Sequence, residues 1–418
     1  MSKLEIEGKA RVSGGIKVSG AKNEALKAIA LSLVLRGKVL LKNIPLISDA
    51  LNLLKVIESI GAEYEISAND VLIDTGQVET STIESPVVGN LRASIVLAGP
   101  LLARFGRFSS LLPGGCVIGA RSIETHLDAF KQLGAEVKIS DDKRLTINLP
   151  KPTKNKIILK EKSVTATENA ILYASAVGSE ITIENCAVEP EIIELTKVIR
   201  SAGAEVRWGE DREVKIKGSQ NLSINEIEIM PDRIEAGTFA ILFVATGGEG
   251  TVYPFPKEEL KAFLEVMKES GANIEIKNDK AIIKKSEKIK PISITTEVYP
   301  GFPTDLQAPM ALIAAIADGV STINETLYEN RLGHLAELEK MGLKVEIIDK
   351  HKAQITGPAK LSPTTIRSYD LRAGITLLIA AIMAEGKTVI ENAELIDRGY
   401  ENIDQKISQL GVKLKRID

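Results

Sequence analysis

Six similar segments follow one another along the chain, each an amphipathic stretch, a glycine and an alternating stretch. The stretch before the glycine repeats apolar residues with helical periodicity, and the stretch after it alternates apolar and polar residues as a half-buried strand does. A glycine suits the end of a helix, where the backbone often needs a positive φ. The pattern predicts one helix-to-strand joint, repeated about every 70 residues, at Gly61, Gly134, Gly203, Gly271, Gly342 and Gly411.

A second set of helices is expected upstream of these joints, and it is apolar nearly all round. Residues 26–35 and 310–317 are examples. A helix with no polar face belongs in a core. Strand-like segments such as residues 39–44 and 388–392 separate the apolar helix from the amphipathic one. The repeated unit is therefore helix, strand, helix, strand.

The six units are predicted to form two groups of three. A chain of 418 residues is too long for one ordinary core and suits two domains of about 200 residues each. Units with such apolar helices cannot form a thin solenoid, so they must surround shared cores. We predict an α/β (α+β) protein with two domains, residues 1–20 plus 231–418 and residues 21–230, and a crossing near residues 208–232. One continuous α/β sheet is the alternative.

Composition narrows the class of function. The formal net charge of -3 argues against a nucleic-acid binder that works through a basic face. Two distant cysteines, Cys116 and Cys186, indicate neither a disulfide framework nor a CxxC metal pair. The first residues lack a signal-peptide pattern, and the longest apolar stretch, residues 375–384, is too short for a bilayer. We expect a cytoplasmic protein with no nucleic-acid or membrane partner.

Cationic residues gather at or near the expected starts of repeat helices. A helix N-terminus already attracts anions, so a cation there works against the helix dipole. Seven such positions in register favour a shared use, which is to hold phosphate or carboxylate through forked hydrogen bonds. For any single arginine the alternative is a solvated or salt-bridged surface group. The seven are Lys22, Arg92, Arg121, Arg233, Arg331, Arg372 and Arg398.

Short motifs lie along the whole chain, among them Ser-Gly-Ala-Lys-Asn at 19–23, Leu-Pro-Gly-Gly-Cys at 112–116, Pro-Gly-Phe-Pro-Thr-Asp at 300–305, Asp-Leu-Arg at 370–372 and Asp-Arg-Gly-Tyr at 397–400. In this order they resemble the UDP-N-acetylglucosamine 1-carboxyvinyltransferases, a family within the wider enolpyruvyl transferase group. The resemblance implies a two-domain inside-out α/β barrel with three units per domain, helices buried and sheets outside, and an active site in the interdomain cleft.

The resemblance also implies an activity. The family transfers the enolpyruvyl group of phosphoenolpyruvate to the 3′-hydroxyl of UDP-N-acetylglucosamine and releases phosphate, through a tetrahedral intermediate. This is the first committed step of peptidoglycan precursor synthesis, which serves cell-wall biogenesis, cell shape and cell division. No metal or organic cofactor is implied. The expected partners are the two small-molecule substrates, and we expect a monomer.

Such an addition needs one group that donates a proton to the methylene carbon and one that takes a proton from the hydroxyl. The resemblance assigns the acid to Cys116, on a glycine-rich loop able to close over the site. It assigns the base to Asp305, and it adds Lys22 and Arg398 to the catalytic set as groups that neutralise phosphate. The alternatives are an ordinary buried thiol for Cys116 and a first-turn helix acid for Asp305. Cys186 is given no role.

Two sets of binding residues follow from the same resemblance. For phosphoenolpyruvate they are Lys22, Asn23, Cys116, Arg121, Arg331, Arg372 and Arg398. For UDP-N-acetylglucosamine they are Asn23, Arg92, Arg121, Ser122, Ile123, Glu124, Thr125, Ser163, Val164, Thr165, Asp305 and Leu327. Ser122 stands where the family often has proline, and Thr165 where it often has glycine, which changes how closely the backbone approaches the nucleotide. His126 either polarises a nearby group or makes a structural polar contact.

Three other functions are weighed against this one. A shikimate-type enolpyruvyl transferase would lack the Pro-Gly-Gly-Cys loop and would carry a lysine-serine-rich opening motif. A catalytically silent paralogue that only binds a nucleotide sugar would not need Cys116, Asp305 and the arginines together. An RNA-end-processing enzyme of related architecture would use a catalytic histidine and a basic surface, and the three histidines form no such motif.

Overall fold

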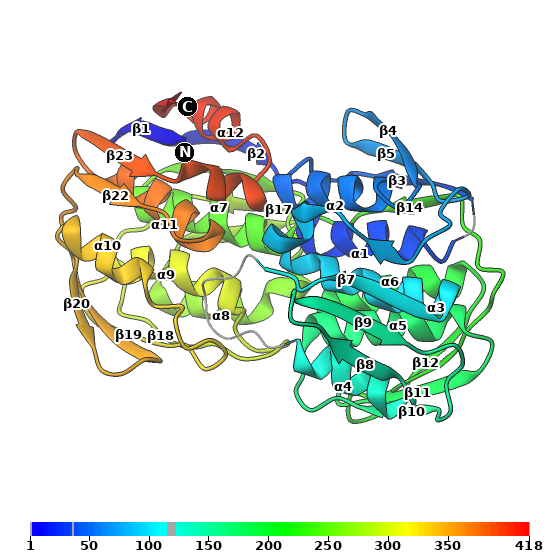
Figure 1. The fold of residues 1–418 in the computed structure, drawn as a ribbon. Coiled ribbons are helices and arrows are strands. Elements are labelled where there is room, and N and C mark those ends of the chain that lie inside the picture. The colour runs from blue at the N-terminus through cyan, green and yellow to red at the C-terminus, as the bar shows by residue number, and fades with distance from the viewer. Residues whose placement is uncertain (1, 36, 115–122, 418) are drawn as a thin grey trace. The chain divides into compact units, whose positions relative to one another are not determined.

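The computed structural model describes residues 2–35, 37–114 and 123–417, which form two units. One unit takes the chain up to Ser19 and again from Pro231 onwards, and we call it the split unit. The other takes the described residues between Gly20 and Met230, and we call it the continuous unit. Each unit has a hydrophobic core of its own. Figure 1 labels helices and strands of both units on the ribbon.

Three four-stranded sheets belong to the continuous unit. In order across each sheet, the strands are β14 (Glu226–Glu228), β3 (Lys38–Lys42), β5 (Asp70–Asp74) and β4 (Glu63–Ser67); β6 (Thr82–Ile83), β7 (Arg107–Leu111), β9 (Arg144–Asn148) and β8 (Glu136–Ile139); and β10 (Lys156–Ile158), β11 (Glu180–Glu184), β13 (Val214–Lys217) and β12 (Glu205–Trp208). The first pair in each sheet is parallel and the others are antiparallel. Because β14 pairs with β3, the last strand of this unit joins the first.

The helices of the continuous unit alternate between buried and amphipathic ones. They are α1 (Lys22–Ser32), α2 (Ser48–Glu58), α3 (Ala98–Phe105), α4 (Glu124–Gln132), α5 (Val164–Ala176) and α6 (Pro190–Ser201), with the 3₁₀ helices η1 (Pro86–Asn90) and η2 (Arg92–Leu97). Nearly every residue of α1 and α5 is buried, as their lack of a polar face predicts.

An ion pair is buried in the core of the continuous unit. Lys27 Nζ of α1 lies 3.1 Å from Glu168 Oε2 of α5, and the two side chains are 4% and 0% exposed. Burial raises the pKa of Glu168 to about 7, although Lys27 opposes the rise; Glu191 and Glu189 add to it. This carboxyl therefore titrates near neutral pH inside an apolar core.

The split unit repeats the same design. Across its sheets the strands are β16 (Ile274–Lys277), β17 (Lys280–Ile283), β15 (Glu249–Tyr253) and β2 (Ser13–Lys17); β18 (Ser293–Thr295), β19 (Gly319–Asn324), β21 (Lys352–Gly357) and β20 (Lys344–Ile347); and β22 (Thr365–Arg367), β23 (Lys387–Glu391), β1 (Lys3–Glu7) and β24 (Lys413–Ile417). Strand β1 lies between β23 and β24 and is antiparallel to both.

Three apolar helices fill the middle of the split unit. These are α7 (Arg233–Thr246), α9 (Thr304–Ile316) and α11 (Leu371–Met383), which pack on one another (Figure 1). Around them lie the amphipathic helices α8 (Lys261–Ser270), α10 (His334–Lys340) and α12 (Ile403–Gln409) and the 3₁₀ helices η3 (Glu258–Leu260) and η4 (Ala393–Arg398). The predicted arrangement of buried helices and outer sheets is confirmed.

The six predicted glycine joints are also confirmed. Each of these glycines follows an amphipathic helix and precedes a strand, and their φ angles lie between 84° and 113°. A side chain would strain that backbone conformation, so glycine is the residue that fits. The described strands form six separate sheets, which rules out one continuous sheet.

Candidate active site

Asp305 lies in the first turn of α9, and both of its carboxylate oxygens are taken by arginines. Arg331 Nη2 donates to Oδ1, and Arg372 Nη2 donates to Oδ2 at 2.9 Å. The arginine side chains are 3% and 6% exposed. Burial alone would raise the pKa of Asp305, but the guanidiniums of Arg372 and Arg331 outweigh it and hold the pKa well below its usual range.

The start of α11 explains how Arg372 reaches this carboxylate. Asp370 caps the helix by accepting hydrogen bonds from the backbone N–H groups of Arg372 and Ala373 at 2.7 and 3.0 Å. The backbone of Arg372 is thus held by its own helix, while its guanidinium extends to Asp305 on α9. The backbone and the side chain of this residue serve different partners.

A tyrosine supports the other side of the guanidinium. Arg372 Nη1 donates to the Tyr400 hydroxyl at 3.0 Å, and that hydroxyl lies 3.0 Å from Thr238 Oγ1 of α7. Asp305, Arg331, Arg372 and Tyr400, called the Asp305 cluster below, therefore join the three central helices of the split unit.

The Asp305 cluster has hydrogen-bond donors to spare. Arg331 Nε, Arg331 Nη1 and Arg372 Nε are buried and have no hydrogen-bond partner among the described residues. An unpaired buried N–H is costly, and guanidinium groups bind carboxylate and phosphate well. The cluster can therefore accept a further anion without giving up Asp305 completely.

Three other predicted residues of the split unit lie outside the Asp305 cluster. Arg398 ends η4, two residues before Tyr400, and is half-buried. Leu327 lies in the loop after β19, where its backbone N–H donates to Glu325 Oε1 at 2.9 Å. Arg233 begins α7, but its guanidinium lies over the Tyr299 ring, 5.9 Å from the centroid. This last arginine makes a cation–π contact.

In the continuous unit, Lys22 begins α1 and pairs with an acid on α2. Lys22 Nζ lies 2.7 Å from Asp49 Oδ2, and the side chains are 11% and 7% exposed. Asn23 follows and is half-buried. Gly20 precedes them because a Cβ there would lie 1.8 Å from the Asn43 carbonyl oxygen. The opening motif thus holds a paired lysine close to a tightly packed backbone.

Three short segments of predicted nucleotide-sugar residues lie at helix starts. Arg92 begins η2, residues 123–125 lead into α4, and residues 163–165 lead into α5, where Ser163 caps the helix by accepting from the Ala166 N–H at 3.4 Å. Thr125 Oγ1 donates to Glu161 Oε1 at 2.8 Å. Backbone N–H groups at helix starts are suited to bind phosphate oxygens.

Thr165, which stands where the family often has glycine, contacts His126. His126 Nε2 lies 3.1 Å from Thr165 Oγ1, and His126 Nδ1 lies 3.0 Å from Asn169 Nδ2. Burial, with help from Arg92 and Lys27, lowers the pKa of His126 to about 3, so the ring is neutral. Of the two possible roles of His126, the geometry supports a structural polar contact, and the hydroxyl of Thr165 provides the partner.

Three predicted residues, Cys116, Arg121 and Ser122, lie outside the described residues. The second cysteine, Cys186, is buried and its Sγ donates to the Ile183 carbonyl oxygen at 3.4 Å. Burial raises the pKa of the Cys186 thiol to about 12, so it is not a reactive thiolate.

Sequence reasoning missed three polar partners in these sites: Asp49, Glu325 and Tyr400. Asp49 and Glu325 had no distinguishing pattern, because an acid in the first turn of a helix or after a strand is common. Tyr400 ends the motif at 397–400, but the motif does not indicate that the tyrosine contacts the site. The signal that would have found it is an aromatic hydroxyl two residues from an arginine already in the predicted site.

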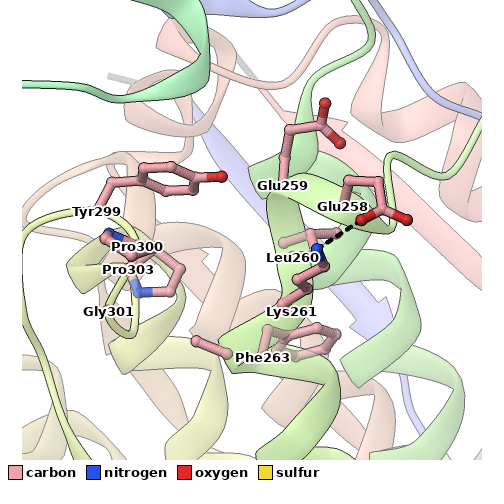
Figure 2. A pocket seen from close by; sticks show the side chains of 10 residues that line it. Glu258, Glu259, Leu260, Lys261, Phe263, Tyr299, Pro300, Gly301 and Pro303 are labelled. Carbon is pink, nitrogen blue, oxygen red and sulfur yellow. Dashed lines mark ion pairs between the residues drawn. The ribbon is translucent and has the colours of Figure 1, made fainter. Parts of the chain in front are cut away.

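A small cavity of about 170 Å³ lies in the split unit between the start of α8 and the loop that precedes α9 (Figure 2). Glu258, Glu259 and Lys261 line one side, with Lys261 Nζ 2.7 Å from Glu258 Oε2, and Tyr299 lines the other. None of these residues belongs to the predicted set, and we assign the cavity no role in the site.

The described part of the chain contains neither a candidate membrane-spanning helix nor a candidate metal-binding group. None of its helices has the length and apolar character that a membrane crossing requires. Within the same residues, no group of three or more histidine, cysteine, aspartate or glutamate side chains is arranged to hold a metal ion.

Comparison with known proteins places the chain in a family. The family model described as EPSP synthase (3-phosphoshikimate 1-carboxyvinyltransferase) matches residues 6–407. Proteins named UDP-N-acetylglucosamine 1-carboxyvinyltransferase from Pelagibacter ubique and UDP-N-acetylglucosamine 1-carboxyvinyltransferase 2 from Carboxydothermus hydrogenoformans are each 39% identical to this chain, and each alignment covers 100% of both proteins.

Solved structures agree on the fold. The enolpyruvyl transferase NikO from Streptomyces tendae has a TM-score of 0.90 at 22% identity over 100% of this chain and 99% of its own. EPSP synthase from Acinetobacter baumannii has a TM-score of 0.75 at 17% identity over 100% of both chains. From the full-length identity and the family match together, the chain belongs to the UDP-N-acetylglucosamine 1-carboxyvinyltransferases, a family of enzymes within the enolpyruvyl transferases.

Proposed function

We propose that this enzyme transfers the enolpyruvyl group of phosphoenolpyruvate to the 3′-hydroxyl of UDP-N-acetylglucosamine and releases phosphate. The observation that carries the proposal is the Asp305 cluster, where a carboxylate and two buried arginines meet at positions that the family motifs predict. The unpaired N–H groups of Arg331 and Arg372 suit an anionic substrate such as phosphoenolpyruvate. The names of the full-length relatives support the acceptor sugar.

Asp305 is proposed as the base that takes the proton from the sugar hydroxyl. A carboxylate whose pKa is held low by two guanidiniums is a weak base. An anionic substrate that binds the same arginines would draw positive charge away from Asp305 and raise its pKa. Binding of phosphoenolpyruvate would therefore make Asp305 a stronger base before it takes the proton from the sugar hydroxyl.

Cys116 is proposed as the acid that protonates the methylene carbon, on the strength of the motif at 112–116. Lys22, Arg121 and Arg398 are proposed to neutralise the phosphate that leaves. In the free enzyme Lys22 is paired with Asp49, so a phosphate would have to share or displace that carboxylate. Nucleotide contacts are proposed for the helix starts at η2, α4 and α5.

The wider role follows from the activity. We propose that the enzyme supplies a peptidoglycan precursor, and with it cell-wall growth, shape and division. We also propose that it acts in the cytoplasm as a monomer and needs no cofactor.

Phosphate release tests the activity directly. Purified enzyme is mixed with phosphoenolpyruvate and either UDP-N-acetylglucosamine or shikimate 3-phosphate, and inorganic phosphate is measured with time. We expect release with the nucleotide sugar only, and its loss in Cys116→Ala. Absence of acceptor-dependent release in the wild type would disprove the assignment, and release with shikimate 3-phosphate alone would replace it with the shikimate-type reaction.

A further inference from the structure

Glu325 is a buried carboxylate to which the proposed reaction has so far assigned no role. It follows β19, and its residue surface is 0% exposed. A buried carboxylate is tolerated only when its oxygens accept enough hydrogen bonds. The hydrogen-bond partners of Glu325 therefore show what the carboxylate holds in place.

One oxygen of Glu325 organises the loop that follows it. Oε1 accepts hydrogen bonds from the backbone N–H groups of Leu327 and Tyr328 at 2.9 and 3.2 Å, and from Thr296 Oγ1 at 2.9 Å. Thr296 Oγ1 in turn accepts from the Thr326 N–H at 3.0 Å. The loop from 325 to 328 is thus folded around this oxygen.

The other oxygen reaches the helix that carries Asp305. Oε2 accepts from Thr304 Oγ1 at 2.6 Å, and Thr304 is the first residue of α9. Glu325 therefore connects the loop after β19 to the start of α9 through a single carboxylate. Asp305 is the next residue along α9.

The same loop leads to Arg331. The guanidinium of Arg331 lies over the Tyr328 ring, 5.3 Å from the centroid, and it donates to Asp305. A path of contacts runs from Glu325 through the Tyr328 backbone and ring to Arg331. A second path runs through Thr304 to Asp305. Both ends of the Arg331–Asp305 pair are thus held by one side chain.

We propose that Glu325 is a positioning residue for the reaction, which sets the placement of Arg331 against Asp305 by holding the loop with Oε1 and α9 with Oε2. The expected effect on kcat rests on the proposed function, whereas the contacts of Glu325 do not. Leu327, proposed to bind the nucleotide sugar, is placed by the same oxygen.

The unequal sharing of donors makes glutamine an informative substitution. Oε1 faces three donors, so the carbonyl oxygen of a glutamine can take its place. Oε2 faces only the Thr304 hydroxyl, which can rotate to accept from the glutamine amide. We expect Glu325→Gln to keep the geometry and Glu325→Ala to lose it.

The experiment follows the Asp305 carboxyl by ¹³C NMR in enzyme labelled at the aspartate carboxyl carbons, with Asp305→Asn to assign the signal. In the wild type we expect the Asp305 signal to stay that of the anion at pH values where an ordinary aspartate is protonated, because both arginines hold its pKa well below the usual range. In Glu325→Ala we expect the midpoint to move up towards that of an ordinary aspartate, because the guanidinium of Arg331 is no longer held against the carboxylate. Glu325→Gln should titrate as the wild type does.

Kinetics supply the second measurement. We expect kcat to fall about tenfold or more in Glu325→Ala, because a misplaced catalytic group loses orientation, and Glu325→Gln to restore most of it. Thr304→Val removes only the link to α9 and should raise the Asp305 midpoint by a smaller amount. Thr75→Val is the control, since Thr75 is a fully buried hydroxyl that donates to the Ser32 and Leu35 carbonyl oxygens of the continuous unit.

The outcomes separate this inference from the proposed function. Lost activity in Glu325→Ala with an unchanged Asp305 midpoint would overturn the positioning role, since a merely structural residue would behave in that way. If Glu325→Ala does not fold, Thr304→Val decides, and an unchanged midpoint there overturns the inference. A wild type without acceptor-dependent phosphate release refutes the proposed function alone, because the NMR titration needs no substrate.

Discussion

The buried pair of Lys27 and Glu168 should make the stability of the continuous unit fall as the pH rises, and one substitution should extend that fall to higher pH. A carboxyl whose pKa rises from 4.5 to about 7 on folding costs the folded state about 3 kcal/mol once the pH exceeds both values. Stability from this group is therefore highest below pH 4.5, falls as the pH rises towards 7 and is flat above.

Lys27→Met removes the attraction that opposes this rise. The pKa of Glu168 then moves above 7, and the loss of stability continues to higher pH. Between pH 5 and pH 8 we expect the variant to lose about 1 kcal/mol more stability than the wild type, because protonation of Glu168 limits the extra cost to the one pH unit between 7 and 8. At pH 5, where Glu168 is protonated, the wild type contains a buried cation without an anion, so Lys27→Met should be neutral or stabilising.

Urea unfolding of the wild type and of Lys27→Met at pH 5 and pH 8 measures the change in unfolding free energy at each pH. The chain has one tryptophan, Trp208 of β12, so its fluorescence reports on the continuous unit. Lys156→Met is the matched control, because the Lys156–Glu184 pair is 52% and 31% exposed and should contribute less than about 1 kcal/mol at either pH. Equal destabilisation of Lys27→Met at both pH values would show that packing, and not charge, explains the effect.

Three further predictions concern the candidate site. Arg372→Met should destabilise the split unit by about 2 kcal/mol or more at pH 7. Because the pKa of Asp305 is depressed on folding, this difference should shrink as the pH falls below 3.8. Urea unfolding followed by circular dichroism, which also reports on the split unit, measures it at pH 7 and at the lowest pH of the folded range, and a difference that does not change with pH would contradict the prediction. Tyr400→Phe removes the acceptor of a charged donor and should cost about 1–3 kcal/mol in the same assay, whereas a cost near zero would mean that water replaces the hydroxyl. The imidazole signals of His126 should not titrate between pH 5 and 8 in an NMR experiment, because its pKa lies at about 3, and a midpoint near 6.5 would show an exposed ring.

The six glycine joints could be predicted because their cause is local. A helix that ends and turns into a strand needs a backbone conformation that glycine adopts without strain, and the periodicities on either side are visible in the sequence. The same reasoning located the buried helices α1 and α9, since a helix without a polar face has only one suitable environment.

The partners of the charged residues could not be predicted in the same way. Arg372 meets Tyr400 and Asp305 from other elements, and those meetings depend on how α9, α11 and the segment after η4 pack. The repeated placement of cations at helix starts predicted that these residues bind anions together. It could not predict that Arg372 contacts Asp305 whereas Arg233 lies over Tyr299. Both begin a central helix of the split unit, yet the second lies against Tyr299.

The position of β1 has a consequence for how the protein is made. This strand, residues 3–7, lies between β23 and β24, to which it bonds along its whole length. A ribosome delivers β1 more than three hundred residues before its two neighbours, which follow after every described strand of the continuous unit has emerged. The continuous unit can close while synthesis proceeds, whereas the opening strand must wait with both hydrogen-bonding edges unpaired. A chaperone that binds extended, alternating segments would find this strand available until β23 and β24 have been made.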